Sequence, residues 1–163
     1  MSEMVCLMFV KNTLTIYLKT QVRGHYKKVM QGFDRELFEA LSPPVGKIDV
    51  VEFTGSKKGD RVHLKFIWPI KAEWVSRITE DGEDKKRSYF VDEGERLPPG
   101  LKYWKHEHIV EDLDGKNSAI IDRIHFRSYV YVFSLLMYPL LFLTFYSRKK
   151  QYKAYFGDST EDL

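Results

Sequence analysis

The spacing of apolar residues divides the chain into stretches that predict different kinds of secondary structure. Residues 13–22 alternate in part between apolar and polar side chains and are rich in β-branched residues, which predicts a strand. From Tyr26 the apolar residues recur at helical spacing, but Gly32 interrupts the run and Asp34 can cap a new start. The pattern therefore predicts two short helices, the second ended by Ser42-Pro43-Pro44.

Short strands separated by turn sequences make up the middle of the chain. The turns are rich in Gly, Pro, Asp and Asn, and one of them is expected at Asp81-Gly82. Their short lengths favour antiparallel neighbours, and Pro69 is expected to mark a sharp corner. The six predicted strands span residues 47–53, 61–69, 71–80, 85–92, 102–112 and 118–127.

The last part of the chain is almost continuously apolar from residue 128 to Arg148, and its spacing predicts a helix. Because Pro139 is tolerable near a helix start but awkward inside a helix, we expect this one to begin near Tyr138 and to end at Gly157. Residues 158–163 are expected to form a frayed tail. The side chains expected to face the sheet are Leu141, Phe145 and Tyr152.

This order of elements, β-α-α-β-β-β-β-β-β-α, predicts an α+β domain with a curved antiparallel sheet of about seven strands. A strongly curved sheet needs an apolar filling in its concavity, and the long closing helix is the candidate. We expect residues 1–163 to form a single domain, of which residues 1–11 are an N-terminal extension.

Six segments, in this order, resemble one known superfamily. They are residues 41–44 (LSPP), 74–80 (WVSRITE), 89–92 (YFVD), 99–108 (PGLKYWKHEH), 122–126 (DRIHF) and 146–149 (YSRK). The chain resembles the START-related helix-grip superfamily, often labelled SRPBCC, with polyketide cyclase-like and lipid-transfer branches. Residues 1–11 and the apolar segment 129–143 depart from its pattern. The resemblance implies a cavity between the sheet and the C-terminal helix that binds a lipid, sterol, polyketide or similar compound. It also implies that the protein could transport this compound.

Composition and charge limit the kinds of binding partner and the cellular compartments that fit this chain. The net charge of +3 is small and both signs are interspersed, which argues against a nucleic-acid binder. Aromatic residues make up 15% of the chain, which suits a cavity wall as well as a dense core. With Cys6 as its one cysteine and Glu3 ahead of the first apolar residues, the chain is expected to lack a disulfide and a signal peptide. We therefore expect a cytoplasmic location.

Alternation along two of the strands brings polar side chains to the expected interior. His106 and His108 share a face with Trp104, and on the next strand Asp122 shares a face with Phe126. Buried polar groups without partners are costly, so the two histidines and the aspartate should bond one another, water or a ligand.

Three interpretations of these polar residues stay open. In the first, the residues hydrogen-bond only to one another and fix the sheet. In the second, they recognise a ligand head group. In the third, they transfer protons in a cyclase-like or hydrolase-like enzyme, with His106 or His108 as the base and Asp122 as its partner. We expect binding rather than catalysis, no cofactor and no metal site, because no third ligand accompanies the histidines. The full set of expected ligand-binding residues is Trp74, Phe90, Trp104, His106, His108, Asp122, Phe126, Phe142 and Phe145.

The apolar segment also supports a membrane-associated alternative. Residues 128–147 are twenty residues without a charge, about the length that spans a bilayer, with tyrosines mostly near the ends. A membrane-spanning helix is disfavoured because the curved sheet would then lose the apolar helix that fills its concavity. A peripheral contact through an apolar loop at residues 129–138 remains a second form of this alternative. The sequence leaves the oligomeric state open.

Overall fold

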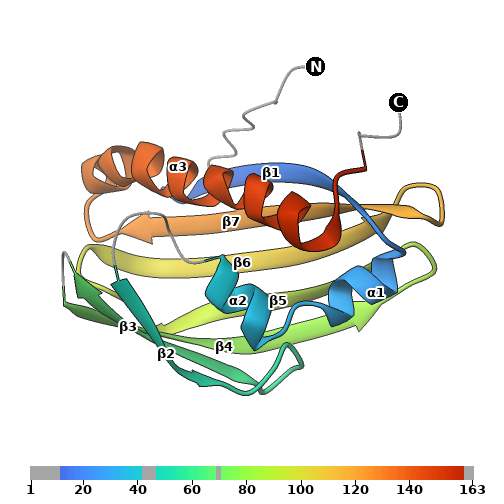
Figure 1. The fold of residues 1–163 in the computed structure, drawn as a ribbon. Helices are drawn as coiled ribbons and strands as arrows, with labels where there is room; N and C mark the ends of the chain where they lie inside the picture. Colours follow the sequence, from blue (N-terminus) through green and yellow to red (C-terminus); the bar gives the residue numbers. More distant parts are fainter. Residues whose placement is uncertain (1–11, 42–46, 69–70, 160–163) are drawn as a thin grey trace.

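A computed structural model describes residues 12–41, 47–68 and 71–159 (Figure 1). Within them, seven strands form one antiparallel sheet in the order β1-β7-β6-β5-β4-β3-β2. The strands are β1 (Leu14–Arg23), β2 (Lys47–Phe53), β3 (Arg61–Trp68), β4 (Ala72–Glu83), β5 (Arg87–Arg96), β6 (Leu101–Asp112) and β7 (Asn117–Ser128). The predicted α+β class and antiparallel sheet are confirmed.

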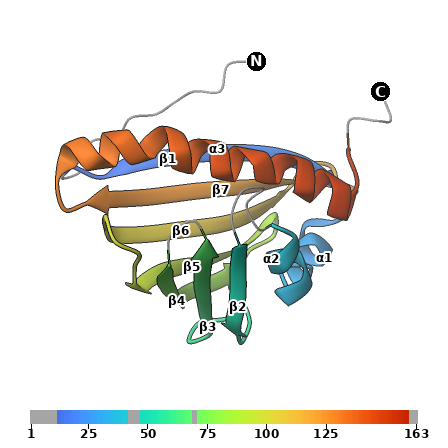
Figure 2. The same ribbon diagram turned by 60° about the vertical axis from the view of Figure 1, so that its left-hand side comes forward.

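In the described part of the chain, three helices pack against this sheet, which curls around them (Figure 2). The two short helices, α1 (Tyr26–Gln31) and α2 (Arg35–Ala40), lie near one end of the sheet, and α3 (Tyr131–Phe156) runs along β1 and β7. Asp34 caps α2 as predicted, because its side chain accepts a hydrogen bond from the Leu37 backbone N–H at 2.9 Å. The prediction of a long helix that closes the sheet is also confirmed, since α3 is that helix.

The inner face of the sheet supplies two apolar clusters. One joins α1, α2 and the C-terminal part of α3 to the sheet and centres on buried Tyr26, Val29 and Tyr152. The other lies under the middle of α3, where Phe126, Leu14 and Ile16 are buried. Each fully buried side chain of this size is worth about 1.5–3 kcal/mol relative to exposure, so the two clusters hold α3 to the sheet.

The predicted start of the long helix is wrong. It begins at Tyr131, so Pro139 lies inside it. Pro139 is on the exposed side of α3, where water can take the backbone carbonyl that the missing N–H leaves without a partner. The first turn is tied to β7 by buried Ser134, whose Oγ accepts a hydrogen bond from the Ser128 N–H at 2.8 Å. Packing of the first turns outweighs the unfavourable proline.

The predicted turn at Asp81-Gly82 is also displaced. β4 continues through these residues to Glu83, and the turn that leads to β5 is built by Asp84. One Asp84 carboxylate oxygen accepts hydrogen bonds from the backbone N–H groups of Lys86 and Arg87, both at 3.0 Å. An aspartate that bonds its own following backbone makes a turn without glycine.

Some sequence-based expectations fall on residues outside the described ranges. These are the extension at residues 1–11, the turn at Ser42-Pro43-Pro44, the corner at Pro69 and the last four residues of the tail. Among the described residues, no helix combines the length and hydropathy needed to cross a membrane. The apolar loop at residues 129–138, given above as one form of the membrane-associated alternative, is not a loop: residues 129–130 precede α3, and the rest forms the first two turns of that helix.

Candidate ligand cavity and its His–Asp network

A cavity of about 640 Å³ lies between the inner face of β2, β3, β4, β5 and β6 and the helices α2 and α3. Its volume falls within the range of about 300–1,000 Å³ that holds drug-sized ligands. The walls are mostly apolar and aromatic. Trp74 and Trp104 meet edge to face with ring centroids 4.6 Å apart, and Phe145 closes the wall from α3 at 5.7 Å from Trp104. The walls suit an apolar ligand body.

The alternation of β6 gives the cavity a polar end. Trp104, His106 and His108 are buried on its inner face, whereas Lys105 and Glu107 point to the outer face. On the outer face Glu107 accepts a hydrogen bond from the Arg123 guanidinium at 3.0 Å. The charged residues of β6 are therefore neutralised outside, and its histidines are left to the interior.

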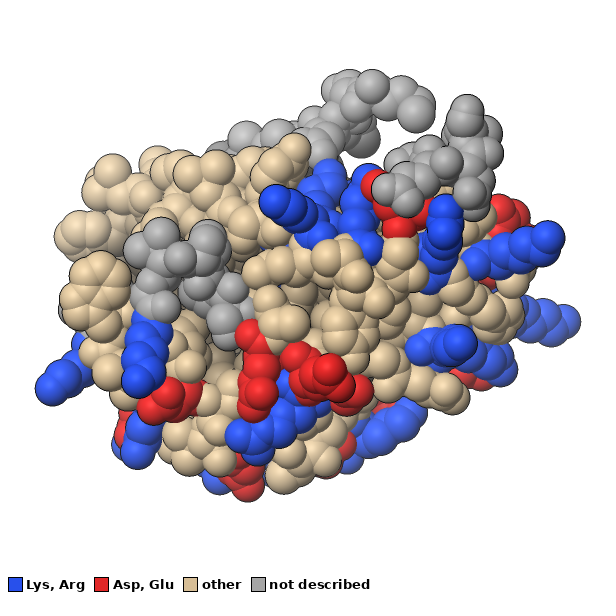
Figure 3. Space-filling view, in the orientation of Figure 1, with Lys and Arg blue, Asp and Glu red and all other residues tan. Residues whose placement is uncertain are grey.

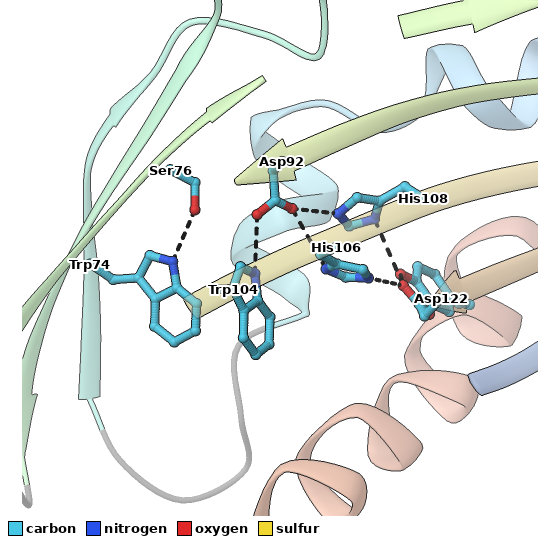
Figure 4. Close-up of polar contacts among 8 residues, drawn as sticks. Trp74, Ser76, Asp92, Trp104, His106, His108 and Asp122 are labelled. Carbon is cyan, nitrogen blue, oxygen red and sulfur yellow. Dashed lines mark hydrogen bonds and ion pairs between the residues drawn. The ribbon is translucent and has the colours of Figure 1, made fainter. Parts of the chain in front are cut away.

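Two aspartates on the neighbouring strands enclose these histidines (Figure 4). The Nε2 atom of His106 lies 2.9 Å from Oδ1 of Asp122 on β7. The Nε2 atom of His108 lies 2.9 Å from Oδ2 of Asp92 on β5. The crossed pairs are longer, with His106 Nδ1 at 3.6 Å from Asp92 and His108 Nδ1 at 3.7 Å from Asp122. Each imidazole thus lies between two carboxylates, and the four side chains form a square.

Further donors complete the square. The Trp104 indole N–H donates to Oδ1 of Asp92 at 3.2 Å, and the Tyr152 hydroxyl from α3 donates to Oδ1 of Asp122 at 3.3 Å. The ring of Phe90 stacks on His108 with centroids 4.3 Å apart. Because α3 supplies Tyr152, the network couples the closing helix to three strands of the sheet.

Burial sets the charge state of this square. Burial and the neighbouring His106 lower the pKa of His108 to about 4, so that ring is neutral at physiological pH. For Asp122, burial acts to raise the pKa, but the hydrogen bond and charge of His106 outweigh it, and the pKa of this carboxyl is lowered. The pKa of Asp92 is lowered in the same way, against burial, chiefly by its hydrogen bond with His108. Both aspartates are therefore ionised at neutral pH.

The tautomer of His108 follows from these charges. A neutral imidazole carries one N–H, and the ionised Asp92 can only accept, so Nε2 of His108 carries the proton. The other nitrogen, Nδ1, is buried without a hydrogen-bond partner. The square is therefore rich in acceptors, and a donor group brought to it gains a hydrogen bond.

The same residues place three metal-ligand atoms close together. One atom each from Asp92, His106 and His108 lies within 4.8 Å of the others, so the sequence argument that a third ligand is missing does not hold. Nitrogen and carboxylate ligands of this kind suit Zn²⁺. Each histidine has its Nε2 atom hydrogen-bonded to a carboxylate, and in metal-binding histidines the nitrogen that does not hold the metal usually makes such a bond. The absence of a metal stays a prediction.

The structure brings most of the sequence-predicted site residues together at the cavity. Those that line it are Trp74, Phe90, Trp104, His106, His108 and Phe145. Asp122, Phe126 and Phe142 are not among the described residues that line the cavity, and their part in ligand binding stays a prediction. Asp122 lies behind His106, Phe126 is covered by α3 where its ring meets Tyr138, and Phe142 stacks between Tyr138 and Tyr146.

Sequence reasoning missed Asp92 and Arg148 as residues of the cavity lining, and it assigned Asp34, a third charged residue of the lining, only to a helix cap. Asp92 has a signal in the sequence, because it lies two residues after Phe90 and thus on the same face of the strand. Arg148 lies three residues after Phe145 and four before Tyr152, on the packed side of α3, and its guanidinium is 4.1 Å from the Phe145 ring centroid. A run of basic residues at the end of an apolar segment concealed this position.

No family model matches the chain, and no curated protein matches it in sequence. Solved structures do match in fold. Norcoclaurine synthase from Thalictrum flavum has a TM-score of 0.64 at 13% identity, over 87% of this chain and 92% of its own. A hypothetical protein from Helicobacter pylori has 0.65 at 16%, over 96% and 99%. The Zhui aromatase/cyclase from Streptomyces sp. R1128 has 0.55 at 17%, over 72% and 70%.

Proposed function

Because the chain has the helix-grip fold, we propose that it binds an amphipathic small molecule in the cavity between the sheet and α3. The observation that carries the proposal is the division of one cavity into apolar aromatic walls and a polar end built by Asp92, His106 and His108. A norcoclaurine synthase of the same fold has been solved with dopamine and hydroxybenzaldehyde, which are small aromatic molecules with polar groups. The ligand class proposed for this chain is a lipid, sterol or polyketide.

The charge of the polar end selects the head group. The carboxylate of Asp92 lines the cavity and is ionised, so it accepts hydrogen bonds and repels anions. The guanidinium of Arg148, which also lines the cavity, offsets the charge of Asp122. A hydroxyl, phenol or amine can donate to Asp92, whereas a carboxylate head would be repelled by the ionised Asp92. We therefore propose a ligand whose polar end is a hydrogen-bond donor.

A matched set of probes tests the head group. Dodecanol, dodecylamine and laurate share one alkyl length, and their binding can be followed by the change in tryptophan emission, since Trp74 and Trp104 line the cavity. The alcohol and the amine should bind at least about tenfold more tightly than the carboxylate, a difference of about 1.4 kcal/mol. Asp92→Asn should remove most of this preference. Binding of all three with equal affinity by the unmodified protein would refute the head-group assignment, and binding of none would refute the proposed function.

The alternative function, a cyclase-like or hydrolase-like enzyme, draws support from the His106–Asp122 pair and from the aromatase/cyclase fold match. A general base needs a nitrogen free to reach the substrate. Both nitrogens of His106 face carboxylates, at 2.9 and 3.6 Å, and the unpartnered Nδ1 of His108 faces Asp122. Binding is therefore the better supported of the two functions.

A further inference from the structure

The first half of α3 is apolar on both sides, but only one side is covered. Toward the sheet it packs Met137, Tyr138 and Leu141 against the cluster that contains Phe126. Away from the sheet it presents what is called here the apolar face, a set of leucine and valine side chains between 46% and 66% exposed. The apolar face consists of Val132, Leu135, Leu136, Leu140 and Leu143, which recur at helical spacing. A contiguous row of five exposed apolar side chains on a surface helix usually marks a contact site.

The apolar face borders the mouth of the cavity. Leu140 and Leu143 of this face also line the cavity while remaining exposed, so they stand at its entrance. On the other side of the entrance, Trp68 at the end of β3 lines the cavity and is 60% exposed. A ligand that enters between them crosses from one apolar surface directly into another.

Basic residues flank the apolar face at both ends. Beyond its C-terminal end α3 carries Lys149 and Lys150, and the whole helix has no acidic residue. Before its N-terminal end the ammonium of Lys102 lies 5.7 Å from the ring centroid of Tyr129, which is 72% exposed. In Figure 3 the surface over the first half of α3, at upper left, shows no charge.

This combination fits the surface of an anionic bilayer. Helices that lie in a membrane interface insert leucine and aromatic side chains and keep Lys and Arg at the level of the head groups. Exposed Tyr129, Phe133, Tyr146 and Trp68 supply the aromatic side chains. A second copy of the chain fits less well. Antiparallel pairing of two apolar faces would bring Lys102 of one copy near Lys149 of the other, and parallel pairing would bring like residues together.

We propose that the protein docks on anionic membranes through the apolar face and Trp68, which places the mouth of its cavity at the lipid surface. This inference rests on the proposed function, because it names the bilayer as the place where the amphipathic ligand enters and leaves. Docking needs no membrane-spanning segment, and it uses a helix that the fold already holds against the sheet.

Vesicle flotation of the full chain tests this docking. The protein should float with vesicles of phosphatidylcholine and phosphatidylglycerol, and much less with phosphatidylcholine alone. The test variant is Val132→Glu combined with Leu136→Glu, since neither residue lines the cavity. It should lower the partition coefficient for anionic vesicles at least about tenfold, because two charged groups then face the acyl boundary. The matched control is Leu113→Glu, a 42% exposed leucine in the turn between β6 and β7.

Two further readouts separate the possible failures. Dodecanol binding in vesicle-free buffer reports the cavity alone and should be the same in the double variant and the unmodified protein. Sedimentation velocity should find the same monomer in both. A chain that binds dodecanol but floats with neither vesicle would overturn the docking and leave the proposed function standing. A dimer that the double variant dissociates, without vesicle binding, would assign the apolar face to a second copy instead.

Discussion

His106 and Asp122 come from neighbouring strands, and their side chains meet at 2.9 Å in the interior, where both are almost fully buried. Asp122 also accepts a hydrogen bond from Tyr152 of α3. The pair therefore links the two sides of the fold, the sheet and the helix that closes it. Its loss should affect stability before it affects any chemistry.

We expect Asp122→Asn to lower the free energy of unfolding by about 1.5–3 kcal/mol, because the buried hydrogen bonds of His106 and Tyr152 then lose their charged acceptor. Asp49→Asn, at an exposed position of β2, is the control and should change it by less than about 0.5 kcal/mol. Urea titrations of both variants measure the difference. If His106→Phe combined with Asp122→Leu costs the sum of its single changes, the two residues do not act as a pair.

The histidines also predict how stability depends on pH. The pKa of His108 is about 4 in the folded protein and near its ordinary value of 6.5 in the unfolded chain. Between these values the unfolded chain binds more protons, so stability should fall as the pH falls from about 6.5 to 4, by about 3 kcal/mol at most from this residue. Half-buried His125, whose pKa is lowered by burial, adds in the same direction. The pKa values of Asp92 and Asp122 are lowered, so their contribution is lost only at still lower pH.

His108→Gln should flatten this pH dependence, since glutamine can still donate to Asp92 but does not titrate. Melting temperatures taken from pH 7 to pH 4 should fall less in this variant than in the unmodified protein. His63→Gln is the control, because His63 lies on β3 outside the network. Parallel curves for the unmodified protein and His108→Gln would contradict the assignment of a neutral His108.

The closing helix offers a direct contrast of two positions. Phe145 is buried against Trp104 and His106, with rings 5.7 and 5.2 Å away. We expect Phe145→Ala to cost about 3–5 kcal/mol. The ammonium of Lys149 lies 5.1 Å from the ring centroid of the exposed Tyr146. Lys149→Ala should lower the free energy of unfolding by less than about 0.5 kcal/mol. Thermal melts in detergent-free buffer measure both, and equal melting temperatures would mean that α3 does not close the sheet.

Metal removal tests the charge balance of the square. Because all four side chains of the square already have partners within it, we expect the purified protein to contain less metal than one ion per chain. Dialysis against EDTA should leave the melting temperature unchanged. Zinc bound at one ion per chain, with a lower melting temperature after chelation, would show that Asp92, His106 and His108 coordinate a metal.

The architecture could be predicted from the sequence, because most strands end at turn signals and α3 carries a long apolar run. Alternation along β6 also placed Trp104, His106 and His108 on the inner face correctly. The start of α3 could not be predicted from local preference, since Pro139 opposes it and long-range contacts of Ser134 with Ser128 hold the first turn. Tertiary packing overrides propensity there.

The partners within the site depend on register, which local pattern does not give. Asp92 lies opposite His106 on the neighbouring strand, and Asp122 lies opposite His108. His106 nevertheless forms its short contact with Asp122 and His108 with Asp92, on the diagonal. Likewise, whether Phe126 faces the cavity or the helix depends on where α3 crosses the sheet. Such relations need the whole fold.

The cavity itself is the central claim, and a change that fills it tests the claim most directly. Leu64 lines the cavity from β3, so Leu64→Trp should occupy space that a ligand needs. Leu113→Trp places the same side chain on the surface. Native mass spectrometry should find one dodecanol bound per chain in the unmodified protein and in Leu113→Trp, and none in folded Leu64→Trp. Equal dodecanol binding in all three proteins would contradict the account.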